Sequence, residues 1–229
     1  APVYDIRNNL LPMFAETVRD SSLLLIDLGH GKDRLGGSVY SQVTQRFDSV
    51  TPDMEDPKEL KKILELIRSL SAKGAILAYH DRSDGGLAAA LCEMMFASHV
   101  GVEIVADALV SKDRTLNQAL FNEELGAVIQ VARGRAAEVE RDFEAAGMGW
   151  SLKYLGNLTQ DDHLNIYLEG KCVLSEDRVD LQKAWNEVSW QIARMRDNPE
   201  CADSEYELIS DKHNGGLVLT MGFDPEENL

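Results

Sequence analysis

Tyr79-His80-Asp81-Arg82-Ser83-Asp84-Gly85-Gly86-Leu87 is a polar stretch that lies between an apolar segment and an amphipathic one. Residues 75–79 are apolar and short, as in a buried strand, and apolar residues recur at helical spacing from Leu87 onward. We therefore predict a strand, a polar loop and a helix in succession. Backbone N–H groups at a helix start suit phosphate, and carboxylates of the loop can hold a divalent cation beside it.

A second glycine-rich loop, residues 29–38, follows the apolar segment 23–28, which is predicted to be a buried strand. The spacing of its glycines matches neither the P-loop nor the dinucleotide-binding fingerprint. Two interpretations stay open at this point. The loop is either a phosphate-cradling turn with Lys32 and Arg34 nearby, or a tight turn that needs glycine for its geometry alone.

The remaining chain alternates strand-like and helix-like segments. The helix after the second loop is expected to run from about Gly37 to Phe47, with Val39, Val43 and Phe47 on one face. Further strands are predicted at 101–105, 125–131, 152–158, 163–168 and 172–174, and further helices at 56–74, 113–121, 134–146 and 177–196. Because the last strands are joined by short turns, the sheet should be mixed. The predicted fold class is α+β with α/β-like layers, a mixed β-sheet packed with helices.

Three regions are expected along the chain. Residues 1–22 form a connecting segment, residues 23–197 form an α–β domain, and residues 198–229 form a polar tail or linker. In the last predicted helix, Trp185 and Trp190 are expected to be buried on or near the apolar face.

Composition excludes several classes of function. The formal net charge of −16 and the pI near 4.7 argue against nucleic acid or an anionic membrane as the main partner. No apolar run approaches the roughly 18 residues of a transmembrane helix, and the first residues lack a signal-peptide pattern. Three widely spaced cysteines predict a reducing compartment rather than a disulfide framework, so we expect a cytoplasmic protein.

Most single residues that could carry chemistry have a simpler interpretation. The histidines outside the loop lack metal-ligand spacing, and none of Cys92, Cys172 and Cys201 has the setting of a nucleophile, so no catalytic residue is predicted. Within the loop, helix capping by Ser83 or Asp84 with a glycine entry would explain part of the pattern. It leaves His80, Asp81 and Arg82 without a structural reason.

Three separated motifs resemble one enzyme family. They are Ala78–Leu87, Leu120–Val131 and Arg196–Glu205, and together they resemble the phosphoribosylformylglycinamidine synthases of the large, single-chain bacterial type. The His-Asp-x-Ser-Asp-Gly-Gly element alone is less specific, because it resembles loops in aminoimidazole ribotide synthase and selenophosphate synthetase. The resemblance implies the C-terminal part of the second aminoimidazole-ribotide-synthase-like repeat, with the corresponding C-terminal domain fold.

The resemblance also implies an activity and site residues. The family converts formylglycinamide ribonucleotide, glutamine and ATP to formylglycinamidine ribonucleotide, glutamate, ADP and phosphate. The position of Asp81 implies a Mg²⁺ ligand and that of Ser83 a nucleotide contact, with Gly85 and Gly86 as further nucleotide-binding candidates. ATP or ADP and Mg²⁺ are expected only together with a preceding synthase domain, and a glutaminase domain is the other expected partner within the polypeptide.

Two alternatives remain beside this interpretation. The domain could hold a structural nucleotide that never turns over, or belong to another synthetase of the same superfamily. The motifs Phe121–Glu124 and Asp197–Glu200 argue against the second alternative. The isolated chain is expected to fold and to lack synthase activity.

Overall fold

The computed structural model describes residues 9–15, 20–46, 50–212, 214 and 222. The chain divides into two compact units, residues 1–181 and residues 182–229. Each unit is described by itself below.

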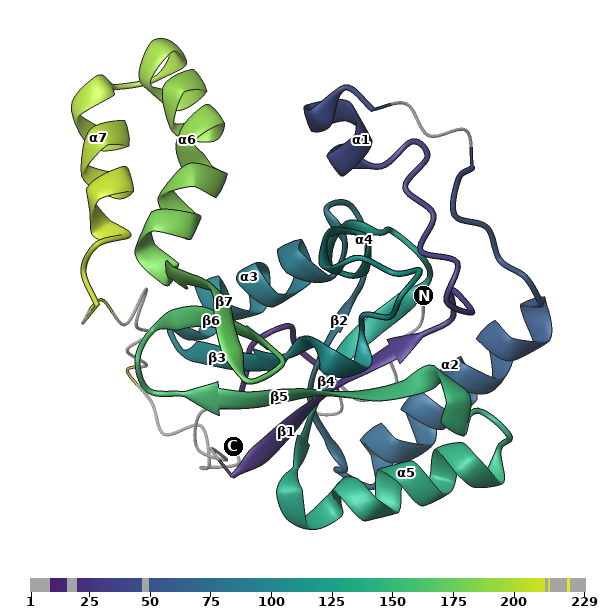
Figure 1. Cartoon of the computed structure of the whole chain (residues 1–229). Coiled ribbons are helices and arrows are strands. Elements are labelled where there is room, and N and C mark those ends of the chain that lie inside the picture. Colours follow the sequence, from purple (N-terminus) through teal and green to yellow (C-terminus); the bar gives the residue numbers. More distant parts are fainter. Residues whose placement is uncertain (1–8, 16–19, 47–49, 213, 215–221, 223–229) are drawn as a thin grey trace. The chain divides into compact units, whose positions relative to one another are not determined.

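The first unit is built on one mixed sheet. Its strands, among the described residues, are β1 (Ser21–Asp27), β2 (Ile76–Asp81), β3 (Gly101–Val105), β4 (Gly126–Ala132), β5 (Leu152–Thr159), β6 (His163–Leu168) and β7 (Lys171–Asp177). They are ordered β2-β4-β1-β5-β3-β6-β7 (Figure 1). The pair β3–β6 is parallel and the other neighbouring pairs are antiparallel, which confirms the predicted mixed sheet and α+β fold.

Several of the α-helices among the described residues begin at a side-chain cap. Among those residues, the α-helices are α1 (Val39–Thr44), α2 (Pro57–Ala72), α3 (Gly86–Ser98), α4 (Leu116–Phe121), α5 (Ala136–Ala145), α6 (Arg178–Arg196) and α7 (Pro199–Leu208). Helix α2 begins as predicted, because the Asp56 carboxylate accepts a hydrogen bond from the Lys58 N–H at 2.9 Å and Pro57 takes the first helical position. Helix α4 begins at a capping box between Thr115 and Gln118, which is later than the predicted start at residue 113.

Helices cover both faces of the sheet. Strand β1 is buried throughout, with Leu23 and Leu25 in a cluster that includes α3, and Leu24 and Ile26 in a second cluster that includes α2 and α5. Alternate side chains of a strand point to opposite faces, so β1 lies between two apolar layers. The loops at the end of β1 and β2 are therefore carried by the centre and one edge of a well-packed sheet.

Helix α1 differs from its prediction. It ends at Thr44 because Gln45 adopts a left-handed conformation with a φ of 55°. The predicted apolar face is exposed: Val43 is 76% accessible and Val39 is 39% accessible, while Phe47 lies outside the described residues. Ser41 is the buried residue of α1, so this helix does not pack its apolar side chains against the core.

The second unit corrects two predictions. Trp185 is 60% exposed, because α6 packs on α7 through a different face. On that face the Trp190 ring stacks on Tyr206 with centroids 4.3 Å apart, and its Nε1–H donates to Asp203 at 2.9 Å. Helix α7 itself lies within the predicted polar tail. Its sequence signal was an Asn198 cap followed by Pro199, where the Asn198 side chain accepts the Glu200 N–H at 2.9 Å.

Candidate functional site

The central loop joins the end of β2 to the start of α3. Asp81 is the last residue of β2, and α3 begins at Gly86. The side chains of Asp81, Ser83 and Asp84 are exposed, and within the described part of the chain they make no hydrogen bond. Two carboxylates and a hydroxyl are therefore presented to solvent from a short, anchored turn.

Both glycines of the loop are required by its shape. Gly85 and Gly86 have φ values of 80° and 70°, which side-chain-bearing residues rarely adopt. A Cβ on Gly86 would lie 2.6 Å from the Asn122 carbonyl oxygen, so α4 approaches the loop too closely for any other residue. The predicted cap by Ser83 or Asp84 is wrong, because Gly85 is the N-cap and provides no side-chain acceptor.

The N–H groups of these glycines are already engaged. The Gly86 N–H donates to the Ser83 carbonyl at 3.0 Å, and the Gly85 N–H donates to Glu123 Oε1 at 2.9 Å. The predicted use of both glycines for a nucleotide phosphate therefore meets an occupied donor at each position.

Arg82 and His80 have structural partners that the sequence did not reveal. Arg82 is buried, and it donates from Nη2 to Asp27 Oδ1 at 2.8 Å and from Nε to the Glu124 carbonyl at 2.6 Å. His80 Nε2 lies 2.7 Å from Glu93 Oε2 on α3. The prediction that His80 and Arg82 lack a structural role is therefore wrong. Of the three residues that the sequence left unexplained, Asp81 still has no structural partner for its side chain among the described residues.

Asp27 is the centre of the buried charge cluster. It lies at the end of β1 and accepts hydrogen bonds from Arg82, from Lys153 Nζ at 2.8 Å and from the Gly29 N–H at 3.1 Å. Burial by itself would raise the pKa of this carboxyl, but the positive charges of Arg82 and Lys153 outweigh burial and hold the pKa well below its usual range. Asp27 is ionised and fixes the two glycine-rich loops to each other at their base. Sequence reasoning missed it because an aspartate at a strand end has no distinguishing local pattern.

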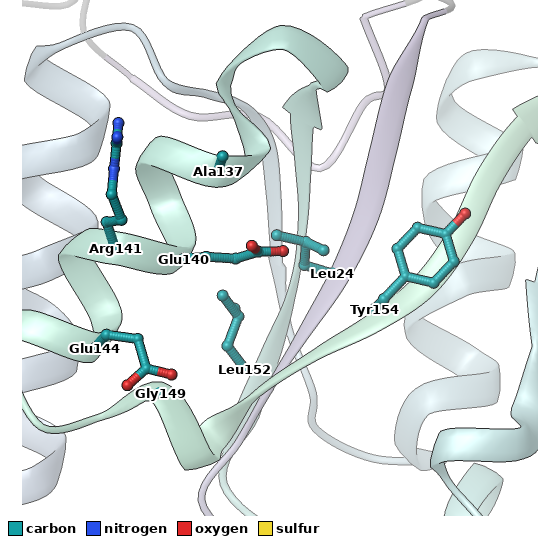
Figure 2. A pocket seen from close by; sticks show the side chains of 8 residues that line it. All are labelled: Leu24, Ala137, Glu140, Arg141, Glu144, Gly149, Leu152 and Tyr154. Carbon is teal, nitrogen blue, oxygen red and sulfur yellow. The ribbon is translucent and has the colours of Figure 1, made fainter.

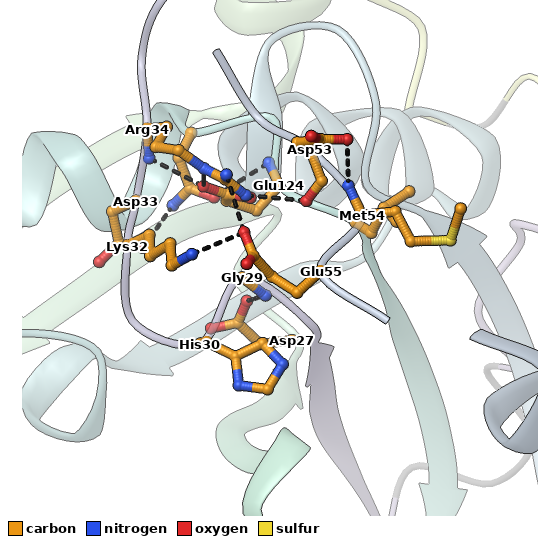
Figure 3. A network of polar contacts seen from close by, with 12 residues as sticks. Asp27, Gly29, His30, Lys32, Asp33, Arg34, Asp53, Met54, Glu55 and Glu124 are labelled. Atoms are coloured by element: carbon orange, nitrogen blue, oxygen red, sulfur yellow. Dashed lines mark hydrogen bonds and ion pairs between the residues drawn. The ribbon is translucent and has the colours of Figure 1, made fainter. Parts of the chain in front are cut away.

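Cations of the second glycine-rich loop are also paired (Figure 3). Arg34 forms a two-pronged contact with Glu124, at 2.7 Å to each carboxylate oxygen, and also donates to Glu55 Oε1 at 2.9 Å. Lys32 Nζ lies 2.7 Å from the same Glu55 oxygen. The backbone is left-handed at His30 and Asp33 as well as at Gly31 and Gly37. These contacts favour a tight structural turn over a phosphate cradle with free cations.

Three consecutive residues before β4 hold that loop in place. Asn122 Nδ2 donates to Asp33 Oδ1 at 3.0 Å, Glu123 accepts the Val39 N–H at 2.9 Å, and Glu124 binds Arg34. Asp33 also faces Arg114, whose Nη2 donates to Asp33 Oδ1 at 2.6 Å. Burial raises the pKa of Asp33 in spite of that arginine. The Asn-Glu-Glu motif thus has a geometric reason, since Asn122 and Glu124 bind residues of the loop after β1 and Glu123 binds the first residue of α1.

The described residues fit Mg²⁺ only in part. No group of three or more histidine, cysteine, aspartate or glutamate side chains with a metal-binding arrangement occurs among them. Asp81 supplies one exposed carboxylate, whereas Mg²⁺ requires near-octahedral oxygen coordination. Asp81 could therefore supply one carboxylate ligand to a magnesium ion whose other ligands come from water or from elsewhere.

Two cavities of the first unit lie apart from Asp81 and Ser83. One, of about 450 Å³, lies between α5 and β5, with Glu140 pointing towards Leu24 (Figure 2). The other, of about 310 Å³, is lined by Asp27, Lys153 and a stack of His30 on Trp150 with centroids 4.1 Å apart. Neither is lined by Asp81, Ser83, Gly85 or Gly86, and the second includes Gly31 of the 29–38 loop.

Among the described residues, none of the helices is both long and apolar enough to cross a membrane.

Comparison with known proteins gives one family and a set of similar folds. The family model "AIR synthase related protein, C-terminal domain" matches residues 21–169. Thermotoga maritima PurL complexed with FGAR is 14% identical with a TM-score of 0.58, over 77% of this chain and 30% of that chain. The same protein complexed with ATP is 13% identical with a TM-score of 0.57, over 74% and 26%. Phosphoribosylformylglycinamidine synthase II from Thermotoga maritima is 12% identical with a TM-score of 0.57, over 74% and 26%.

At these identities the structures show a shared fold. The chain spans between a quarter and a third of the length of these relatives.

Proposed function

This chain belongs to the family described as AIR synthase related protein, C-terminal domain, and on that premise we propose that it is a nucleotide-binding part of an ATP-dependent amidating ligase. The proposed enzyme is a phosphoribosylformylglycinamidine synthase, with this chain in the C-terminal part of its second synthase-like repeat. It would convert formylglycinamide ribonucleotide, glutamine and ATP to formylglycinamidine ribonucleotide, glutamate, ADP and phosphate. Solved PurL structures complexed with ATP and with FGAR support the ligand classes.

One observation carries the proposal for the site. The side chains of Asp81 and Ser83 are exposed and make no hydrogen bond among the described residues, while Arg82 between them is bound to Asp27 in the core. A loop that is rigid at its base and offers a carboxylate and a hydroxyl suits a magnesium nucleotide, since the hydroxyl can donate to phosphate. Magnesium, when bound, would neutralise phosphate charge. Asp81 would bind the magnesium ion as one of its ligands, and the Ser83 hydroxyl would orient the phosphate.

The proposed partners follow from the incomplete site. A preceding synthase domain of the same polypeptide would supply the other magnesium ligands, and a glutaminase domain would supply ammonia. Free cysteines at 92, 172 and 201 support a reducing, cytoplasmic setting.

The alternative of a structural nucleotide has its own support. Lys32, Arg34 and Arg82, the lysine and arginine residues within the two loops, are all paired with carboxylates. A nucleotide at Asp81 and Ser83 would therefore find little free positive charge from this chain to stabilise phosphoryl transfer.

The decisive experiment compares three variants of the full-length protein. Asp81→Asn and Ser83→Ala should each lower the amount of ADP or ATP retained after desalting in magnesium buffer. Asp84→Asn is the matched control, because it removes an equally exposed carboxylate from the same loop and should retain the wild-type amount. Equal retention in all four proteins would refute the proposed site.

Two further measurements separate the proposed activities. Isotopically labelled ATP should exchange into the Asp81 site during turnover if that nucleotide is a substrate, and should stay excluded if it is structural. Formation of formylglycinamidine ribonucleotide by the full-length protein tests the parent reaction. Ammonia-dependent turnover by the 229-residue chain alone would contradict the proposal that its site is incomplete.

A further inference from the structure

A single oxygen of Glu123 connects the two glycine-rich loops at their rim. Glu123 Oε1 accepts the Gly85 N–H from the Ser83–Gly86 turn and the N–H of Val39, the first residue of α1 directly after the other loop, both at 2.9 Å. The two nitrogens therefore lie no more than 5.8 Å apart, the sum of those two distances. An anionic oxygen is already seated where the loops converge.

This rim contact differs from the buried contact at Asp27. Asp27 also receives donors from both loops, Gly29 and Arg82, but it is almost fully buried and is compensated by Arg82 and Lys153. Glu123 is only partly buried, and within the described residues no cation pairs with it. Breaking the contacts of Asp27 would leave unpaired charges buried in the core, whereas the Glu123 carboxylate can move into solvent without leaving a buried charge unpaired.

The proposed nucleotide site makes this arrangement consequential. The Gly86 N–H is used within the turn, so Gly85 is the glycine whose N–H a phosphate could take over. The Gly85 N–H cannot make a full hydrogen bond to a phosphate oxygen and to Glu123 Oε1 at the same time. A phosphate and the Glu123 carboxylate, both within hydrogen-bond distance of one N–H, would also repel each other. One must leave for the other to bind.

We propose that Glu123 is an internal competitor for the phosphate of the nucleotide: its carboxylate occupies the Gly85 N–H and moves away when a phosphate oxygen binds there. Its departure also releases the Val39 N–H, so nucleotide binding is coupled to the start of α1, where the loop after β1 ends. Glu123 thus sets the affinity of the loop for phosphate and is a positioning residue, not a catalytic one. The inference rests on the proposed nucleotide-binding function.

The test is the affinity of the full-length protein for ADP and for adenosine in two variants. Glu123→Gln keeps an oxygen that can accept both N–H groups but removes the charge, so ADP should bind about tenfold more tightly. Adenosine affinity should not change, because adenosine has no phosphate to compete. Glu65→Gln on α2 is the charge-matched control, since its carboxylate is solvent-exposed, and it should leave both affinities unchanged.

The outcomes distinguish failure of the inference about Glu123 from failure of the proposed nucleotide-binding function. If Ser83→Ala weakens ADP binding but Glu123→Gln leaves it unchanged or weaker, Glu123 is a fixed strut and the inference is overturned while the site stands. If neither Ser83→Ala nor Asp81→Asn affects ADP binding, the proposed function fails first. A Glu123→Gln effect of equal size on ADP and adenosine would also overturn competition with phosphate.

Discussion

Arg82 and Asp27 form a buried ion pair that joins β2 to β1, with Arg82 Nη2 2.8 Å from Asp27 Oδ1 and side-chain exposures of 0% and 1%. The residues are 55 positions apart in the sequence, and strand β4 lies between their strands in the sheet. The pair therefore fixes the candidate nucleotide loop to a neighbouring loop across an intervening strand. One guanidinium nitrogen, Arg82 Nη1, is buried without a hydrogen-bond partner among the described residues, so the pair is not fully compensated.

Replacing Arg82 should destabilise the fold strongly. Arg82→Met removes the guanidinium and leaves the Asp27 carboxylate buried with fewer partners, and losses of about 3–5 kcal/mol are typical of such a change. Chemical denaturation followed by circular dichroism measures the free energy of unfolding. Arg133→Met is the matched control, because Arg133 pairs with Asp20 at the surface with side-chain exposures of 56% and 81%. The control should cost no more than roughly 1 kcal/mol, the range of exposed ion pairs. Similar losses in the two variants would contradict the importance of burial.

Acid unfolding should depend on Asp27. Its folded pKa is held below the ordinary value of 3.8 by Arg82 and Lys153, against the opposing effect of burial. A depressed carboxyl pKa adds stability that is present above the unfolded pKa and is lost as the pH falls through the folded pKa. The wild-type protein should therefore lose stability below about pH 4, and Asp27→Asn should be less stable at neutral pH but lose less on acidification. Urea midpoints measured between pH 7 and pH 3 test this, and an unchanged slope in Asp27→Asn would refute it. Asp33 acts in the opposite sense, because its raised pKa makes its charged form unfavourable in the folded state.

Caps, turn residues and apolar spacing within one segment were enough to predict the helices and strands. Whether a given face of a helix is buried depends on elements far away in the sequence. Helix α2 was predictable because its cap, its first-turn proline and its apolar stripe all lie within one segment. The exposed faces of α1 and α6 were predicted wrongly for a common reason. Periodicity indicates which residues share a face but not whether another element covers it, and Trp185 and Val43 face solvent.

The candidate site was only partly readable for a similar reason. The composition of the loop marked it as unusual, and the two left-handed glycines confirm that its backbone is special. The role of Arg82 depends on Asp27 and on the Glu124 carbonyl, 42 residues further along the chain. No spacing rule relates those positions, because the sheet order brings them together. The same holds for Glu123, whose two donors are 38 and 84 residues away.

Cys92 should be chemically inert in the folded protein. Burial raises the pKa of its thiol to about 11, and the neighbouring Glu93 carboxylate adds to this effect. The reactive thiolate is then on the order of one part in a thousand at pH 8. Cys172 and Cys201 are exposed and should be modified first. Thiol labelling followed by peptide mass spectrometry should show two fast sites, with Cys92 labelled only after denaturation. Labelling of Cys92 at the rate of the other two would contradict its burial.

Gly86 should be the least replaceable residue of the nucleotide loop. Its φ of 70° is unfavourable for alanine, and a Cβ would lie 2.6 Å from the Asn122 carbonyl oxygen and 2.7 Å from that of Leu120. Both obstacles are backbone atoms of α4 and its end, so they cannot rotate away as a flexible side chain would. Gly86→Ala should therefore shift the start of α3 away from α4 and destabilise the protein by more than its backbone conformation alone requires.

Gly74 provides the control that separates conformation from crowding. Its φ of 63° is similar, but among the described residues no other atom lies within 4 Å of the position that an alanine Cβ would take. Gly74→Ala should cost roughly 1–2 kcal/mol from the left-handed conformation alone. Hydrogen exchange provides the second measurement, because only Gly86→Ala should increase exchange at the amides of the first turn of α3. Equal unfolding free energies in the two variants would show that the loop and α4 adjust easily, and that the close approach to Asn122 does not hold the site in place.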